Sequence, residues 1–334
     1  MKLTTLMKSV SAVVLAAGIL PGTATAAPEF KLTFSTYWPT TYNYLYDPMV
    51  SFANKVKERS NGRIEVEIFH SAQLFGGKEE LSALERGDID LASPLDTYNT
   101  GLIPALGISS MPFMWPNPDA IQKTLDAGLF DLGINQVLAK RNVKVLNVAA
   151  GGPYQIYGKG FAVRKPADLK GKKIAVSGTA ASKAMELIGA APTSMSSSDL
   201  YVALQRGTID ATSRPLLTGI GRKLYEVLDN VTIVNMSYFT TFLGINMKTW
   251  NKLPPDLQKI VQQAANERSA EQVKMLNQYL ADAKSLFEKN GVNYYVSPAN
   301  ELKAFKDVVS PVYGWWKSQV PDAQKYIDFS LKNQ

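Results

Sequence analysis

The stretch ALERGDIDLAS at residues 83–93 recurs in the second half of the chain as ALQRGTIDATS at residues 203–213, with seven of the eleven positions identical. Each copy is typical of the last turn of an amphipathic helix, then a glycine that can adopt positive φ, then a short strand. Chance is the alternative explanation, because such a turn between a helix and a strand is common. The repeat predicts two similar α/β lobes, each of which presents the end of a strand to a shared cleft.

The residues that follow the two repeated strands are the first candidates for a binding site. Ligands of open α/β sheets bind outside the carboxyl ends of the strands. The first strand runs into Ser93-Pro94 and the second into Ser213-Arg214-Pro215. We therefore expect residues 93–98 and 213–214 to form walls of the cleft.

The N-terminus has the pattern of a secretory signal peptide. Lys2 and Lys8 accompany an apolar run at residues 10–20, which is too short to span a bilayer. The small residues at 24–26 offer a cleavage site, so we expect residues 1–26 to be removed near Ala26. No other apolar run approaches about 20 residues. We expect a soluble, exported, periplasmic protein whose fold depends on its core alone, because the chain contains no cysteine.

The rest of the chain alternates strands and helices with repeated crossovers, which predicts an α/β fold of two lobes with mostly parallel sheets. Its 334 residues, 46% apolar and 19% charged, suit two globular lobes. Gly151-Gly152-Pro153 interrupts a predicted strand and marks the crossover between lobes. We assign residues 27–152 to lobe I together with about 242–270, and residues 153–241 to lobe II together with about 271–334.

A long helix and an aromatic loop stand out within this pattern. Residues 257–289 contain few helix breakers and an apolar stripe, which predicts a helix of roughly 45–50 Å that spans both lobes; two further helices are expected to close the chain. Residues 37–46 form a loop dense in tyrosine. Asp47-Pro48 is expected to begin the next helix as N-cap and first-turn proline.

The residue types needed for catalysis or metal binding are scarce. The single histidine, His70, has no cluster of partners and there is no cysteine, so no ordinary zinc site is predicted. No serine nucleophile elbow, phosphate-binding loop or dinucleotide fingerprint occurs. Carboxylates are plentiful, but their spacing selects no catalytic pair. We expect a binding protein without catalytic residues, metal or cofactor, which closes around its ligand by a hinge motion.

The charge pattern gives only a weak indication of the ligand. The formal net charge is +7, and the basic residues are scattered along the chain. This pattern does not indicate nucleic-acid binding. A mild positive field favours anionic ligands, and ordinary solubilising surface charge is the alternative. We find no heptad pattern or exposed apolar stretch that requires a dimer, and we expect a monomer.

Several blocks of the chain, in order, resemble the DctP-type solute-binding proteins of tripartite ATP-independent periplasmic (TRAP) transporters. They are SAQLFGGKE at 71–79, LERGDID at 84–90, MPF at 111–113, PADLKGKKI at 166–174 and LYVALQRGTID at 200–210. The resemblance covers nearly all of the mature chain. It implies two α/β lobes, a long helix that spans them, a small-molecule ligand, and delivery of that ligand to the TRAP permease membrane subunits.

One position departs from the pattern of this family. After the PADLKGKKI block the family usually carries an arginine that pairs with the carboxylate of the ligand, whereas this chain has Ala175. Bidentate pairing of arginine with carboxylate is a strong specificity device, so its loss puts a simple organic acid held in that way in doubt. Arg214 can bind an anion from a different wall, or it is a surface arginine. Asp96 can accept from a hydroxyl or ammonium group, or it caps its own loop.

Aromatic and polar residues complete the predicted site. The six aromatic residues that we consider for a cage around a cation, ring or sugar are Tyr37, Trp38, Tyr42, Tyr44, Tyr98 and Tyr154, although each alone is more often a packing residue. Gln155 and Ser177 lie in segments that line the cleft in the family. The predicted ligand-binding residues are Tyr37, Trp38, Asp96, Tyr98, Tyr154, Gln155, Ala175, Ser177, Arg214 and Tyr238.

The sequence thus predicts an extracytoplasmic receptor that delivers a small polar organic ligand to TRAP membrane subunits. We favour an organic anion, a carboxylate or sulfonate, held by Arg214. A small amine held by Asp96 and aromatic residues is the alternative within this class. Outside it, the alternatives are an exported hydrolase that uses carboxylates of the cleft, and a sensor subunit that presents its ligand to a membrane receptor.

Overall fold

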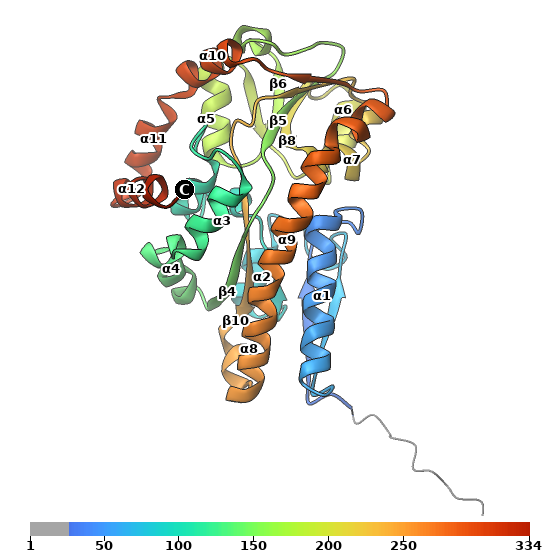
Figure 1. The fold of residues 1–334 in the computed structure, drawn as a ribbon, viewed down its shortest axis with the longest axis vertical. Coiled ribbons are helices and arrows are strands. Elements are labelled where there is room, and N and C mark those ends of the chain that lie inside the picture. Colours follow the sequence, from blue (N-terminus) through green and yellow to red (C-terminus); the bar gives the residue numbers. More distant parts are fainter. Residues whose placement is uncertain (1–26) are drawn as a thin grey trace, which may run out of the picture.

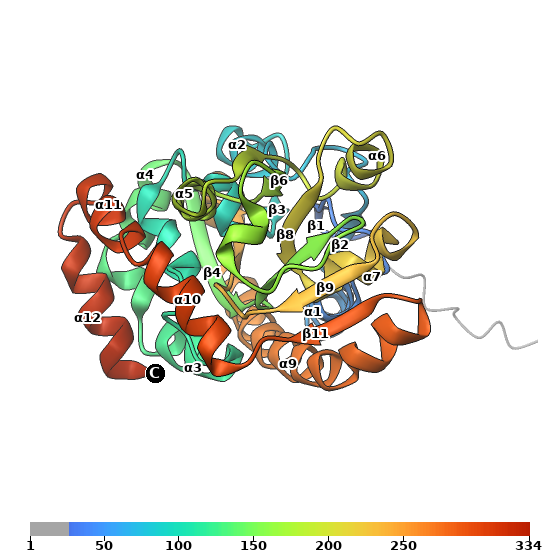
Figure 2. The same cartoon turned by 90° about the horizontal axis from the view of Figure 1, so that it is seen from above.

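The computed structural model describes residues 27–334, so the predicted signal peptide at 1–26 lies outside the described part. Two β-sheets, one in each lobe, are flanked by helices (Figures 1 and 2). Within residues 27–334, no helix is both long and apolar enough to cross a membrane.

The sheet of lobe I has the strand order β2-β1-β3-β10-β4. Its strands are β1 (Phe30–Ser35), β2 (Ile64–Phe69), β3 (Leu91–Ala92), β4 (Val143–Ala150) and β10 (Thr240–Asn246). β1 pairs in parallel with β2 and β3, and β10 is antiparallel to both of its neighbours, β3 and β4. All strands except β10 therefore run in one direction.

The sheet of lobe II has the order β11-β9-β5-β8-β6-β7. Its strands are β5 (Tyr154–Gly158), β6 (Lys173–Val176), β7 (Ala191–Ser194), β8 (Ala211–Pro215), β9 (Asn230–Ile233) and β11 (Asn293–Val296). Here β5 is antiparallel to β8 and β9, and the other pairs are parallel. The prediction of two α/β lobes with mostly parallel sheets is confirmed.

The repeated stretch forms the same turn in both lobes. Helix α2 (Glu80–Arg86) ends at Gly87, and helix α6 (Leu200–Gln205) is followed by Gly207; the two glycines have φ of 83° and 69°. The strands that follow are β3 and β8. The last aspartate of each copy also makes the same kind of hydrogen bond. Asp90 and Asp210 each accept from a main-chain N–H of the neighbouring strand at 2.9 Å.

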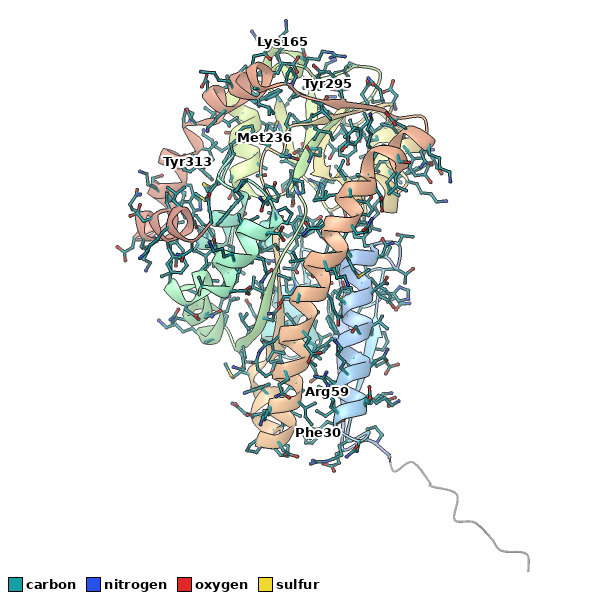
Figure 3. The ribbon with its side chains drawn as sticks, in the orientation of Figure 1. Phe30, Arg59, Lys165, Met236, Tyr295 and Tyr313 are labelled. Carbon is teal, nitrogen blue, oxygen red and sulfur yellow. The ribbon has the colours of Figure 1, made fainter. Side chains whose placement is uncertain are left out.

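Helix α9 (Pro255–Lys289) spans both lobes, as predicted. Its 35 residues give a length of about 52 Å. In lobe I it packs on β4 and on α1 (Asn43–Arg59), and in lobe II it contacts β11 and α7 (Leu216–Gly221) (Figure 1). Arg59, labelled beside α1 in Figure 3, pairs with Glu267 of α9 through contacts of 2.7 and 3.0 Å.

Two further segments cross between the lobes and are bonded to each other. One joins β4 to β5 through Gly151-Gly152-Pro153, and the other joins β9 to β10. Gln155 connects them, because its Oε1 accepts from the N–H groups of Val234 (2.8 Å) and Asn235 (2.9 Å). The main-chain carbonyl of Met236, labelled in the upper half of Figure 3, accepts from the N–H of Phe113 at 2.6 Å.

Two expectations about helices were wrong. The helix expected to begin at Asp47-Pro48 begins at Asn43, so Pro48 lies inside α1. The carbonyl of Tyr42 accepts from two N–H groups of the following turn, so one helical turn forms before the proline. Three helices close the chain where two were expected, because Pro311 and Pro321 interrupt the last helical segment.

The remaining helices cover the two sheets. They are α3 (Pro118–Asp126), α4 (Ile134–Lys140), α5 (Thr179–Ile188), α8 (Met247–Lys252), α10 (Ala299–Val309), α11 (Val312–Gln319) and α12 (Ala323–Asn333), with the short 3₁₀ helices η1 (Asp96–Asn99), η2 (Pro104–Ser110), η3 (Leu129–Leu132), η4 (Pro166–Leu169) and η5 (Leu224–Glu226). α10 packs on α5, whereas α12 packs on α3 and η3. The residue limits that we assigned to the two lobes stay a prediction.

Candidate functional site

A cavity lies where the two lobes meet, at the ends of strands from both sheets. Six of the ten predicted site residues line it: Tyr37, Trp38, Tyr98, Tyr154, Ser177 and Arg214. Tyr42 and Tyr44 from the predicted aromatic cage also line it. The structure thus brings together the aromatic loop of lobe I and the end of β8 in lobe II.

Arg214 is the charged group of this cavity. Its side chain is 2% exposed and donates to three main-chain carbonyls, those of Ser213 (2.9 Å), Val176 (3.1 Å) and Met195 (2.6 Å). Its Nε has no partner, and no carboxylate among residues 27–334 forms an ion pair with it. A buried cation without a counterion is costly, so this position is suited to a bound anion.

Arg214 lies on the strand next to Ala175, the position where the family usually carries its arginine. Ala175 on β6 pairs in register with Thr212 on β8. Arg214 is two residues further along β8, and residues two apart on a strand share a face of the sheet. Arg214 therefore projects from the same face as Ala175, one strand away. Ala175 itself is buried in the apolar core of lobe II and does not line the cavity.

Three hydroxyl groups join the lobes beside Arg214. Thr97 Oγ1 of lobe I lies 2.6 Å from Ser177 Oγ and 3.3 Å from the hydroxyl of Tyr154, both of lobe II. Burial raises the pKa of Tyr154 although the nearby Arg214 charge lowers it. These hydroxyls are hydrogen-bonded to one another, so they hold the lobes together in this conformation.

Asp96 lies next to the cavity but faces away from it. Its carboxylate accepts from the N–H of Thr97, from the hydroxyl of Ser109, and from both the N–H and the hydroxyl of Thr240 (2.8 Å each). Burial raises its pKa to about 7, against these hydrogen bonds, which lower it. These are the contacts of a residue that fixes the loop η1 to β10.

Gln155 and Tyr238 also lie outside the lining. Both polar atoms of the Gln155 amide are hydrogen-bonded to the segment that joins β9 to β10. Oε1 accepts from the N–H of Val234, and Nε2 donates to Asn235 Oδ1 at 2.6 Å. The Tyr238 hydroxyl donates to the carbonyl of Pro116 at 3.3 Å, and burial raises its pKa to about 12. Both side chains are buried and hold segments of the chain against each other.

Glycines bring the backbone close to the aromatic wall. A Cβ on Gly77 would lie 2.8 Å from the Tyr37 ring, and a Cβ on Gly221 would lie 2.5 Å from the Tyr42 ring. Real Cβ atoms do not approach other atoms so closely, so any larger residue at either glycine requires the ring to move. The positions of the two rings therefore depend on glycine.

The lobes are also in contact through hydrogen bonds of Tyr98 and Lys78. Tyr98 of lobe I accepts from the N–H of Ser197 at 2.8 Å, and Lys78 donates to the carbonyl of Ser194 at 3.0 Å. The space enclosed is about 20 Å³, enough for about one water molecule. A ligand of several atoms therefore enters only when the lobes or the lining side chains move.

Sequence reasoning did not select most of the apolar part of the lining or its second serine; Leu95 alone falls within the predicted wall at residues 93–98. The unselected residues are Leu45, Ser197, Pro215, Leu217, Thr218 and Phe239. Pro215, Leu217 and Thr218 directly follow Arg214, so the rule that sites lie beyond strand ends was enough to find them. The others carry no signal that separates them from ordinary core residues.

A buried carboxyl behind the aromatic loop allows a test of this packing. Glu80 accepts from the N–H of Tyr37, its other oxygen has no partner, and burial raises its pKa well above 4.5. Because the folded pKa is raised, the stability from Glu80 is present below about pH 4.5 and is lost as pH rises through the raised pKa. Glu80→Gln avoids this loss, so its Tm should exceed that of the wild type by several degrees at pH 8.

The two Tm values should converge near pH 4.5, where the wild-type carboxyl is protonated in the folded state. Thermal unfolding followed by circular dichroism at both pH values measures the difference. A difference that is the same at pH 4.5 and pH 8 would show that Glu80 is not a buried, unpaired carboxyl.

The two lobes, the crossing segments between them and the enclosed cavity define a two-lobed ligand-binding protein. The chain belongs to the DctP family, described as bacterial extracellular solute-binding protein, family 7, whose model matches residues 34–319. Members of this family are solute-binding transport proteins. The predictions of a TRAP solute-binding protein and of a protein without enzymatic activity are thereby confirmed.

Individual relatives agree with this family. The chain is 28% identical over 285 residues to the C4-dicarboxylate-binding periplasmic protein DctP of Vibrio cholerae, covering 83% of this chain and 82% of the relative. A TRAP periplasmic solute-binding protein of Ralstonia eutropha with bound (S)-2-acetolactate is 26% identical, with a TM-score of 0.83 over 90% of this chain and 99% of that one. The protein of Chromohalobacter salexigens with bound D-glucuronate shares the fold, with a TM-score of 0.85 at 21% identity over 91% of this chain and all of that one.

Proposed function

We propose that this chain is the periplasmic receptor of a TRAP transporter for a small organic anion, which it holds with Arg214 and delivers to the TRAP membrane subunits. The periplasmic location and the membrane partners are proposed on the basis of the family. We further propose that Tyr37, Trp38, Tyr98, Tyr154 and Ser177 contact the ligand, because they line the same cavity as Arg214.

The observation that carries the proposal is the state of Arg214. It is a buried guanidinium in the wall of the interlobe cavity, it has one unpaired donor, and its hydrogen bonds go only to neutral carbonyls. A carboxylate placed against it would supply the missing counterion and a charge-assisted hydrogen bond. The relatives named above are described with carboxylates, which supports the same class of ligand.

The amine alternative lacks comparable support. A buried ammonium group requires a carboxylate partner, and none of the cavity residues within 27–334 is acidic. Asp96, the acid on which that alternative depended, already accepts from four donors of the protein itself.

A thermal-shift screen of carboxylates, sulfonates, amines and neutral sugars tests the proposal. A ligand at 100 times its Kd adds about 2.7 kcal/mol to the free energy of unfolding, which raises Tm by several degrees. We expect stabilising compounds among the organic anions. Stabilisation by amines or neutral sugars alone would contradict the proposal.

A further inference from the structure

We infer that the ligand has one carboxylate and an otherwise apolar body, so that this receptor discriminates against dicarboxylates and sugar acids. The inference rests on the proposed function and narrows its class of ligand. Three properties of the cavity lead to it: its charge, its unpaired hydrogen-bonding atoms, and its apolar wall.

The charge of the cavity matches a single anionic group. Arg214 is the one charged residue among the fifteen described residues that line it. A second arginine, Arg222, contacts the same wall but is outside the lining: it donates to the carbonyl of Tyr37 at 3.2 Å, and its guanidinium lies 5.4 Å from the centre of the Tyr42 ring. One negative charge therefore has a partner in the cavity, and a second has none.

The unpaired hydrogen-bonding atoms of the lining match one carboxylate. Tyr42 OH, Ser197 Oγ and Arg214 Nε are buried and have no partner in the protein. Trp38 Nε1, beside the Tyr37 hydroxyl, also lacks a well-aligned partner. The nitrogens only donate, whereas the hydroxyls donate or accept. A carboxylate offers about four lone-pair positions, so the acceptor capacity of one carboxylate matches these four groups.

Three other hydroxyls of the lining already have partners in the protein. The hydroxyl of Thr97 in lobe I is hydrogen-bonded to the hydroxyls of Ser177 and Tyr154, with oxygen–oxygen distances of 2.6 and 3.3 Å. The hydroxyl of Tyr98 accepts from the N–H of Ser197. For a ligand with several hydroxyl groups, such as a sugar acid, to bond to Ser177, Tyr154 or Tyr98, these hydroxyls would have to exchange their present partners for the ligand.

A large part of the wall is apolar. Leu45, Leu95, Leu217 and Phe239 surround the same cavity, and all four side chains are buried. A second carboxylate among these side chains would lose its hydration without gaining a cation or donors. We expect this loss to weaken binding of a dicarboxylate at least about 100-fold relative to a monocarboxylate of the same length.

Isothermal titration with a matched pair of acids tests this selectivity. The protein, residues 27–334, is titrated with pentanoate and with glutarate, which have the same number of carbons and differ by a terminal carboxylate in place of a methyl group. D-glucuronate is the sugar-acid probe. We expect pentanoate to bind at least about 100-fold more tightly than either glutarate or D-glucuronate.

The possible results separate this inference from the proposed function. If glutarate or D-glucuronate binds as tightly as pentanoate, and binding depends on Arg214, the inference is wrong and the anion receptor remains. If none of the three acids binds and the thermal-shift screen finds no organic anion, the proposed function fails as well.

A second variant tests the use of the unpaired hydroxyl. Because Tyr42 OH has no partner in the protein, Tyr42→Phe should leave Tm unchanged while the Kd for pentanoate rises about tenfold. Tyr313→Phe is the control, for which we expect the opposite effects on Tm and on the Kd for pentanoate. Its hydroxyl donates to the carbonyl of Pro112 at 2.9 Å, and Tyr313, labelled at one side of the molecule in Figure 3, does not line the cavity. The variant should therefore lower Tm and leave the Kd unchanged. An unchanged Kd for Tyr42→Phe would contradict the inferred carboxylate contact.

Discussion

Arg214→Gln is expected to raise the Kd for the preferred carboxylate at least about 100-fold, as measured by isothermal titration. Truncating one partner of a buried charge pair typically costs 2–5 kcal/mol of binding free energy, roughly 30-fold to several thousand-fold. The Tm of the ligand-free protein should change by no more than a few degrees. Glutamine loses some bonds to the carbonyls of Ser213, Val176 and Met195, but it also removes a buried charge without a counterion.

Two further variants serve as controls for Arg214→Gln. Arg214→Lys keeps the charge but has no Nε and no planar fork, so its affinity should lie between those of the wild type and Arg214→Gln. Arg206→Gln changes an exposed arginine just after helix α6 and should bind like the wild type. If Arg214→Gln folds and binds the carboxylate with unchanged affinity, Arg214 is a structural residue and another group holds the anion.

Gly151→Ala is expected to lower both stability and affinity. A Cβ at this position would lie 2.2 Å from the ring of Phe239, which lines the cavity, and the two residues are also joined by a 2.8 Å hydrogen bond between their backbones. The ring or the crossing segment must move, which costs about 1–3 kcal/mol of unfolding free energy. Because the displaced ring is part of the apolar wall, the Kd should also rise. Urea unfolding and isothermal titration measure the two effects.

The chain offers a control and a rescue for this substitution. Gly101→Ala places a methyl group in open space and should be nearly neutral. Phe239→Ala removes the clashing ring, so the double variant Gly151→Ala/Phe239→Ala should be more stable than the sum of the two single effects predicts. A Gly151→Ala protein as stable as Gly101→Ala would mean that the close packing between Gly151 and Phe239 is not rigid.

The sequence was sufficient for features that depend on local pattern. The repeated glycine turn at Gly87 and Gly207 follows from backbone geometry, and the spanning helix α9 follows from its apolar stripe and lack of breakers. The position of Arg214 at the cavity followed from its place immediately beyond a predicted strand, where ligands of α/β sheets bind. Each of these arguments uses residues that are close together in the chain.

The features that were missed depend on contacts between distant segments. Asp96 was a candidate ligand residue because of its place after a strand, but its carboxylate is bonded to Thr240, far along the chain. Phe239 lines the cavity, yet an apolar cavity wall and an apolar core have the same sequence pattern. The first turn of α1, before Pro48, places Tyr44 and Leu45 in the lining. This turn was not predicted, because Pro48 was interpreted as the first-turn proline of the helix.

A crystal structure of the protein grown with pentanoate tests the central claim most directly. We predict a carboxylate oxygen at about 2.8 Å from Arg214 Nε, with the hydrocarbon chain against Leu217 and Phe239. The account would be contradicted if the carboxylate were bound by Arg222 or outside the interlobe cavity while Arg214 kept only its bonds to main-chain carbonyls.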